Sequence, residues 1–494
     1  GTAGIKRVIN GPMIWSPDSN VLYGPHPDLK NYFCCNGIIP GFSQSGGMGL
    51  MSAQWMVDGE SQYDMFAWDV ARFGDWADKA FTKARVGDQY AKRFAIHFPN
   101  EEREAGRPVR TRPIHALQQA LGGVFGLNYG WEHVQWFADA PGAKDTNGFT
   151  RQNWFEPVGR ECRMLRENAG IIDISNFAKY RVRGPKAADW LNAIFANNMP
   201  KAVGRSCLTP LIGVRGGIAG DFTVTRLADD EFMVIGSGMA ERYHQRFWNM
   251  VPMPEGVSFE SLTEAMCGFN VAGPKSRELL QRLTNTSLAT ADFPFMRSKW
   301  IELAGVDCLA LRVSFTGDLG WELHCSTEDQ LRLYQALLDA GKTFSAGPVG
   351  GRALMSLRVE KGYGSWSREY SPEYWPQEVG LAGLIKLDKE FLHKQAYLAI
   401  KCNPPREILS IVEILDVTVA DATGGEPIFD KAGNGVGRVT SGTYGYGVNK
   451  SLALCYLKNV APGDELDVMI LGIPHRAVVL AEPPFDPSGA KLRG

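Results

Sequence analysis

The order of strand and helix patterns along residues 171–340 is the feature that most constrains the fold. Short apolar strands alternate there with amphipathic helices, and the pattern starts again near residue 269. Residues 405–485 differ, because they are rich in Gly and Val and show short alternating runs with few helical patterns. Such alternation between turns is typical of strands, so this stretch predicts a small β-barrel or a jelly-roll-like module. We therefore expect an α+β protein of several domains.

Length and charge exclude several classes of protein. The 494 residues suggest two to four domains at roughly 100–200 residues per domain. The 52 Lys+Arg and 54 Asp+Glu give a formal net charge of −2, which argues against a dedicated nucleic-acid binder. No run approaches ~18 consecutive apolar residues, so no membrane span is expected.

The nine cysteines and eight histidines show neither CxxC pairs nor metal-ligand spacing. We therefore expect reduced thiols, no metal site, and a cytoplasmic or mitochondrial-matrix location. The first residue is Gly1 with no signal peptide after it, which suggests a processed product or a fragment.

A glycine-rich run, Gly41 to Gly49, precedes a segment with helical periodicity at Leu50–Val57. A strand, a glycine-rich loop and a helix in that order suit a helix N-terminus that faces an anionic or polar group. The same order also serves as an ordinary connector, so this signal alone decides nothing.

A polar cluster is predicted where Gly216 and Gly217 lead into a strand that begins at Asp221. Asp221–Arg226 and Glu231–Ile235 are expected to pair across a short turn. Asp221, Thr223 and Thr225 share one face of the strand because side chains repeat every two residues. The alternative interpretation is a solvated strand edge.

Two further segments carry charged residues at turns. Glu322 follows a glycine-rich turn between two β runs, so its carboxylate faces either a pocket or water. Arg358 lies with Glu360 and Lys361 at the end of a predicted helix. Such a cluster can bind a carboxylated ligand, although surface ion pairs are the commoner use.

Taken in order, these motifs resemble the family of dimethylglycine and sarcosine dehydrogenases. The run from Phe149 to Arg226 resembles their folate-binding part, whose fold is shared with aminomethyltransferase. The matching pieces are Asn153-Trp154-Phe155, Gly159-Arg160-Glu161-Cys162, Asp173-Ile-Ser175, Gly184-Pro185, Gly216-Gly217, Gly273-Pro274, Ser356–Tyr363 and Thr440-Ser441-Gly442. The resemblance implies 1–75 as the end of an FAD-dependent oxidoreductase domain, 76–150 as a connecting domain, 151–400 as an aminomethyltransferase-like folate-binding domain and 401–494 as a C-terminal β-barrel.

Two departures from the family pattern stand out. The dinucleotide-binding βαβ unit, normally far upstream in the family, is absent from these residues, so tight FAD binding by this chain alone is not expected. Phe315 also stands where the family usually has Tyr, seven residues before Glu322. A ring contact with the pterin is compatible with Phe315, whereas a phenol hydrogen bond is not.

The resemblance also implies a mechanism. An N-methyl amine loses a hydride to FAD, and tetrahydrofolate captures the iminium product as 5,10-methylenetetrahydrofolate. Asp221 matches the family's catalytic carboxylate. Glu322 matches the family's pterin-contacting acid. Thr223 and Phe315 are expected to line the same pocket, and Arg358 is expected to bind the folate tail.

Gly46, Gly47 and Gly49 are expected to let the backbone approach the flavin ring. Dimethylglycine, sarcosine and other N-methyl amines remain open as substrates. Two rivals also remain: a flavin-independent folate-dependent aminomethyl or methyl transferase, and a folate-binding subunit that pairs with a separate FAD-bearing chain. A homo-oligomer is a further option.

Overall fold

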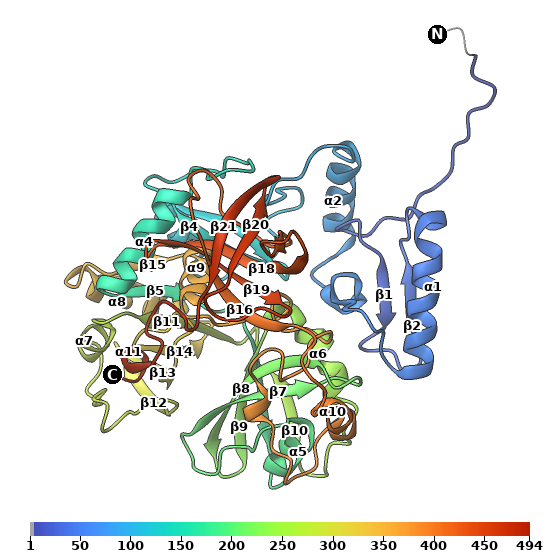
Figure 1. Cartoon of the computed structure of the whole chain (residues 1–494). Coiled ribbons are helices and arrows are strands. Elements are labelled where there is room, and N and C mark those ends of the chain that lie inside the picture. Colours follow the sequence, from blue (N-terminus) through green and yellow to red (C-terminus); the bar gives the residue numbers. More distant parts are fainter. Residues whose placement is uncertain (1–3) are drawn as a thin grey trace. The chain divides into compact units, whose positions relative to one another are not determined.

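The computed structural model describes residues 4–494, which form two compact units (Figure 1). The first unit holds the residues up to Ile96 together with Arg103–Val109, and the second holds His97–Glu102 and Arg110–Gly494. No helix among the described residues is both long and apolar enough to cross a bilayer.

The first unit is a two-stranded sheet with helices against it. The strands are β1 (Leu22–Pro25) and β2 (Phe33–Asn36), and the helices are α1 (Gly41–Asp58), η1 (Phe66–Trp68), η2 (Val70–Arg72) and α2 (Lys79–Ala91). Val21, Tyr23, Met48 and Met65 form its small core, against which Trp55 packs.

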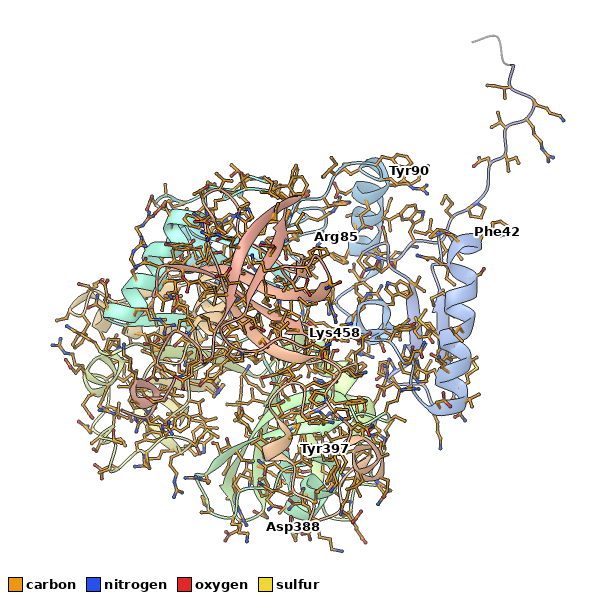
Figure 2. The ribbon with its side chains drawn as sticks, in the orientation of Figure 1. Phe42, Arg85, Tyr90, Asp388, Tyr397 and Lys458 are labelled. Atoms are coloured by element: carbon orange, nitrogen blue, oxygen red, sulfur yellow. The ribbon has the colours of Figure 1, made fainter. Side chains whose placement is uncertain are left out.

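The glycine-rich loop expected at Gly41–Gly49 is wrong. Helix α1 begins at Gly41 and runs for 18 residues, so Gly46, Gly47 and Gly49 lie inside it. A glycine costs up to about 1 kcal/mol in a helix interior, yet packing of Met48 against the hairpin outweighs this propensity. Phe42, at the start of the helix, is exposed (Figure 2).

The second unit contains an antiparallel five-stranded sheet, hereafter the first sheet, with strand order β10-β6-β9-β8-β7. Its strands are β6 (Ala178–Arg183), β7 (Ser206–Ile212), β8 (Ile218–Ala228), β9 (Glu231–Gly236) and β10 (Ser258–Ser261), with α5 (Ala187–Ile194), η3 (Gly238–Ala240) and α6 (Glu241–Trp248) beside them. The predicted pairing of residues 221–226 with 231–235 is confirmed by the β8–β9 ladder.

A six-stranded second sheet has the order β12-β13-β14-β11-β5-β15, and β15 runs parallel to β5. The strands are β5 (Gly170–Asp173), β11 (Met266–Ala272), β12 (Ser298–Leu303), β13 (Val306–Leu311), β14 (Gly320–Ser326) and β15 (Gly347–Val349). Helices α7 (Ser276–Gln281) and α8 (Gln330–Lys342) contribute Leu279, Leu333 and Leu337 to one core with Trp321 and Leu323 of β14.

A closed barrel follows, with the strand order β16-β19-β18-β17-β20-β21, so the predicted all-β module at 405–485 is confirmed as a barrel. Its strands are β16 (Ile408–Ile414), β17 (Pro427–Phe429), β18 (Gly435–Gly445), β19 (Lys450–Leu457), β20 (Glu465–Ile470) and β21 (Ile473–Val479). Buried Val412, Ile428 and Val468 fill its interior. Figure 1 shows the barrel in orange to red.

Shorter elements complete this unit and join the barrel to the sheets. They are α3 (His115–Ala120), the hairpin β3 (Gly123–Asn128) and β4 (Trp131–Phe137), α4 (Phe155–Glu167), α9 (Gly351–Glu360), η4 (Ala382–Leu384), α10 (Lys394–Ile400) and α11 (Ala490–Arg493). Val359 of α9 packs with Ile411 and Leu452 of the barrel. The α+β multidomain fold expected from the sequence is thus confirmed.

Candidate functional site

Asp221 lies on β8 with its side chain on one defined face of the first sheet. Thr223 shares that face, and it lies directly opposite Ile235 of β9. Directly opposite residues of an antiparallel pair project to the same side. The face that carries Asp221 and Thr223 is therefore the face that carries Ile235. Phe222, on the other face, packs against Phe195 and Trp248.

The second sheet presents Glu322 toward this same face. Met233 and Ile235 of the first sheet share one apolar cluster with Leu309 and Leu311 of β13. Leu311 lies directly opposite Glu322 of β14, so the two side chains leave the second sheet on the same side. Asp221 and Glu322 therefore lie on the facing surfaces of two packed sheets.

The described residues supply no cation to balance the charge of Asp221. Among residues 4–494 it forms no ion pair, and burial raises the pKa of its carboxyl to about 6, against the effect of its own backbone N–H. The pKa of nearby Tyr370 is raised by burial and, in second place, by the negative charge of Asp221. A carboxylate with this pKa exchanges a proton near neutral pH, as a general base must.

A buried histidine supports the start of β8. His244 is fully buried, and its Nε2 lies 3.1 Å from the Ala219 carbonyl oxygen. Burial lowers its pKa to about 3, so the ring is neutral. Gly220 makes room for it, because a Cβ there would lie 2.8 Å from His244 Nε2. Sequence inspection missed this contact because His244 lies far from Ala219 in the chain.

Glu322 is half-buried, with 18% of its side chain exposed. Its Oε2 lies 3.6 Å from Nε2 of His324, which is fully buried on the same strand. The exposed-hairpin interpretation of Glu322 is therefore wrong. Because the Glu322 side chain is partly exposed, its carboxylate can accept hydrogen bonds from a ligand.

Phe315 lies in the loop between β13 and β14, and its ring stacks on Tyr363 at 5.9 Å with an interplanar angle of 16°. Hydroxyl groups of Ser314 and Thr316, 2.9 Å apart, brace the loop. Thr316 also bonds Asp318, which pairs with Arg166 of α4. The Phe315 ring is thus fixed in position before any ligand arrives.

Arg358 is fully buried, so the interpretation of its cluster as a surface ion-pair array is wrong. It donates hydrogen bonds to Glu369 (2.7 Å), to the Tyr363 carbonyl (2.8 Å) and to Ser441 (2.6 Å). The pKa of Glu369 is lowered because Arg358 and the hydroxyls of Ser441 and Thr440 outweigh its burial. Both terminal nitrogens of Arg358 are thus occupied within the protein, and its role toward a folate tail stays a prediction.

The sequence matches three family descriptions in consecutive segments. Residues 58–111 match the FAD dependent oxidoreductase central domain, 114–389 the GCVT N-terminal domain and 411–486 the glycine cleavage T-protein C-terminal barrel domain. The second of these covers more than half of the chain. The chain belongs to the GCVT domain family.

Relatives combine this GCVT domain with further sequence. Dimethylglycine dehydrogenase of Mus musculus is 34% identical over 99% of this chain, and 4-methylaminobutanoate oxidase (formaldehyde-forming) of Paenarthrobacter nicotinovorans is 32% identical over 100%. The chain spans only 57% and 60% of the lengths of these two relatives. The resemblance to the dimethylglycine and sarcosine dehydrogenase family is confirmed.

A solved structure shares the fold of the GCVT domain and barrel. Glycine cleavage system aminomethyltransferase T from Bartonella henselae superposes with a TM-score of 0.67 at 22% identity. The match covers 76% of this chain and 98% of that one. It establishes an aminomethyltransferase-like fold.

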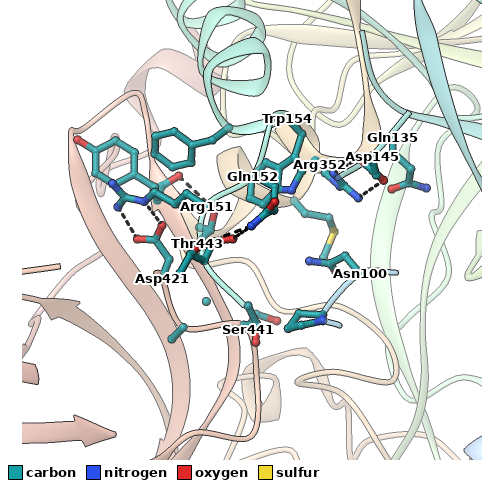
Figure 3. A pocket seen from close by; sticks show the side chains of 18 of the residues that line it. Asn100, Gln135, Asp145, Arg151, Gln152, Trp154, Arg352, Asp421, Ser441 and Thr443 are labelled. Carbon is teal, nitrogen blue, oxygen red and sulfur yellow. Dashed lines mark hydrogen bonds and ion pairs between the residues drawn. The ribbon is translucent and has the colours of Figure 1, made fainter. Parts of the chain in front are cut away.

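The second unit also contains a cavity of about 180 Å³ between the segment 145–155, α9 and the barrel (Figure 3). Two arginines in its wall are paired bidentately: Arg151 with Asp421 at 2.7 and 2.9 Å, and Arg352 with Asp145 at 2.8 Å. Of the site residues predicted from the sequence, Arg358 alone lines this cavity. The cavity is therefore distinct from the surfaces that carry Asp221 and Glu322.

The part of the chain that the structure describes holds no group of three or more His, Cys, Asp or Glu side chains suited to a metal ion. The polar groups of the two facing sheets are instead carboxylates, a hydroxyl, an amide and an imidazole, contributed by Asp221, Glu322, Thr223, Asn270 and His324. This set suits hydrogen bonding to N–H groups and proton transfer.

Proposed function

We propose that this chain binds tetrahydrofolate between the facing surfaces of the two sheets and uses it to capture an iminium derived from an N-methyl amine. The amine is of the dimethylglycine or sarcosine type. The observation that carries the proposal is Asp221, a half-buried carboxylate without a cationic partner among the described residues, whose pKa burial raises to about 6. Membership of the GCVT domain family and similarity to dimethylglycine dehydrogenase support it.

The transfer step balances without an added redox reagent. N5 of tetrahydrofolate attacks the electrophilic iminium carbon and forms an N5–CH₂ bond. The C–N bond to the amine then breaks, and the amine leaves with one proton. N10 closes the five-membered ring and loses the second proton, so the products are the demethylated amine, 5,10-methylenetetrahydrofolate and H⁺. The demethylated amine is secondary when the substrate is dimethylglycine and primary when it is sarcosine.

Asp221 is proposed as the group that accepts the proton and stabilises the cationic carbon. As an anion it attracts the iminium, and with a pKa near 6 it holds the proton only briefly at neutral pH. Glu322 is proposed to accept N–H bonds from the 2-amino-pyrimidinone edge of the pterin. Phe315 and Thr223 are proposed to line the same site, and Arg358 is proposed to act toward the folate tail.

Oxidation of the amine is proposed to occur at a FAD-binding domain, either in the same polypeptide or in a separate chain. FAD, when bound, would accept the hydride that the amine loses. The glycine face of α1 fits such a neighbour, because among the described residues, the adjacent helix backbone apart, no heavy atom lies within 4 Å of a Cβ built on Gly46 or Gly49. Near Gly47 the only contact is Met51 Cε at 3.8 Å. This part of the proposal assigns the chain to a demethylating amine oxidoreductase that feeds one-carbon metabolism.

The first test is calorimetry of tetrahydrofolate binding to the purified chain, with a visible spectrum of the same sample. Binding without a flavin absorption band supports a folate-transfer half that works with an oxidase half elsewhere. Weakened binding in Glu322→Gln but not in Asp229→Asn locates the ligand at the facing sheets, since Asp229 is 97% exposed at the β8–β9 turn. A folded chain that does not bind tetrahydrofolate contradicts the proposal.

A flavin-independent aminomethyl transfer is the second candidate. The observation that favours it is the fold match, which accounts for 98% of the solved aminomethyltransferase with 76% of this chain. Transfer can be followed in reverse, as release of tetrahydrofolate from 5,10-methylenetetrahydrofolate that depends on added N-methylglycine. Release that depends instead on ammonia together with a free thiol, and not on N-methylglycine, favours the second candidate.

A further inference from the structure

His324 is a buried polar residue whose hydrogen-bonding capacity is unused. The imidazole is fully buried, and neither ring nitrogen has a hydrogen-bond partner among the residues that the structure describes. Buried polar groups in folded proteins nearly always have partners, because leaving one unpaired is costly. An unsatisfied imidazole therefore calls for a functional explanation.

The backbone directs His324 and Glu322 to the same side. They are two residues apart on β14, so their side chains leave the same face of the second sheet. Trp321 and Leu323, which alternate with them, point into the core on the opposite face. Nε2 of His324 lies 3.6 Å from Oε2 of Glu322, slightly beyond hydrogen-bond range. A small side-chain rotation closes this gap.

Gly268 determines where the imidazole ring lies. It is directly opposite His324 in the β11–β14 ladder. A Cβ built on Gly268 would lie 2.9 Å from Nδ1 of His324, closer than real Cβ atoms approach a neighbour. The ring thus occupies the space that a side chain at position 268 would fill, and Nε2 is the nitrogen that faces Glu322.

The other nearby cation does not compete for Glu322. Lys179 is fully buried, and its Nζ donates to the carbonyl oxygens of Ser175 and Phe177 at 2.9 Å each. Burial lowers the pKa of His324. The negative charge of Glu322 acts in the opposite direction but does not outweigh burial, so the imidazole is neutral. A neutral imidazole can donate one N–H to the carboxylate without cancelling its negative charge. The carboxylate then remains a strong acceptor for ligand N–H groups.

We propose that His324 is a positioning residue: it donates Nε2–H to Glu322 and holds that carboxylate toward the N–H edge of the bound ligand. The inference rests on the proposed function, because the ligand is the pterin of tetrahydrofolate. It adds a residue that acts through Glu322 and does not touch the ligand. Nothing in the sequence singled out His324, since a lone histidine in a strand resembles any core residue.

The test is a double-mutant cycle read by calorimetry with tetrahydrofolate. His324→Leu keeps the size but removes the donor, and it is expected to weaken binding by about 10-fold or more, the scale of a hydrogen bond to a charged group. His324→Gln retains an N–H donor near the position of Nε2 and should stay within about 3-fold of wild type. In a Glu322→Gln background, His324→Leu should change affinity by less than about 2-fold, because a positioning residue acts only through its partner.

Equal losses in the wild-type and Glu322→Gln backgrounds would overturn the inference, since a general structural role does not depend on Glu322. The inference would also be overturned if His324→Gln and His324→Leu weakened tetrahydrofolate binding equally. Gly268→Ala offers a second route, because it displaces the ring without removing it. It should weaken tetrahydrofolate binding in wild type and add nothing to His324→Leu; an additive effect would count against the inference.

A readout without folate separates this inference from the proposed function. Nitrogen NMR of histidine-labelled protein should show the Nε2–H tautomer for His324, with a shift that moves in Glu322→Gln. An Nδ1–H tautomer would overturn the positioning role even if tetrahydrofolate binds well. Absence of tetrahydrofolate binding in a folded sample with the Nε2–H tautomer would instead overturn the proposed function and its pterin ligand.

Discussion

Two polar regions of the second unit shift the pKa of their carboxylates in opposite directions. At the junction of α9 with the barrel, Glu369 is paired with Arg358 and two hydroxyls, and its pKa is lowered. Between the two sheets, Asp221 has no cationic partner within the part of the chain that the structure describes, and burial raises its pKa to about 6. In the first region the carboxylate is neutralised and hydrogen-bonded within the protein, which holds the fold together. In the second, the described residues give Asp221 no cation and the His324 ring no hydrogen-bond partner, which is typical of a site that binds a ligand.

The largest effect should come from breaking the satisfied region. Arg358→Met leaves Glu369 buried without its cation, so we expect the free energy of unfolding to fall by about 3–5 kcal/mol. Urea denaturation followed by circular dichroism measures this loss. The matched control is Arg476→Met, which removes an ion pair exposed by 62% and 67% and should cost less than about 1 kcal/mol. If both variants lost the same free energy of unfolding, the Arg358–Glu369 pair would not be a structural contact.

The next effect concerns chemistry at the unsatisfied region. Asp221→Asn keeps shape and removes the proton acceptor, so transfer should fall at least ~100-fold while the chain stays folded. N-methylglycine-dependent release of tetrahydrofolate measures the rate, and Asp229→Asn is the control on the same hairpin. Near-wild-type transfer by Asp221→Asn would remove Asp221 from the mechanism.

The same substitution should stabilise the protein at neutral pH. Because the folded-state pKa of Asp221 is raised, the folded state binds the proton more tightly, and wild type loses stability as pH rises from about 4 through about 6. Asp221→Asn lacks this loss. It should therefore be more stable than wild type by on the order of 1 kcal/mol above pH ~6, and the difference should vanish below pH ~4. Denaturation curves of the wild type and the variant at both pH values measure the sign of this stability difference.

The smallest expected effect is at Phe315. Phe315→Tyr keeps the stacked contact with Tyr363 and adds a phenol hydroxyl, so we expect tetrahydrofolate to bind about 3-fold more tightly, a gain within ~1 kcal/mol. Phe315→Leu removes the ring and should weaken binding instead. Calorimetry on the two variants compares what the added hydroxyl and the aromatic ring each contribute to the affinity for tetrahydrofolate. Weaker binding by the Tyr variant would place the Phe315 edge against an apolar part of the ligand.

Local patterns made much of the fold predictable. The strand pair that carries Asp221 and the β-barrel at 405–485 were predicted correctly, because alternation along a strand reports burial of one face. The loop at Gly41–Gly49 was predicted wrongly, since a glycine-rich helix is stabilised by packing of Met48 and not by propensity. Such long-range packing leaves no signal within the segment itself.

By itself, the sequence determined the α+β multidomain class, the family and the identity of the two candidate carboxylates, because periodicity and motifs are local. Only the tertiary structure decided what surrounds them. It placed Asp221 and Glu322 on facing sheets and occupied Arg358 with Glu369. It also set His324 beside Glu322 and His244 behind Asp221. The physical reason is that the energy of a buried charge depends on partners that distant parts of the chain bring to it.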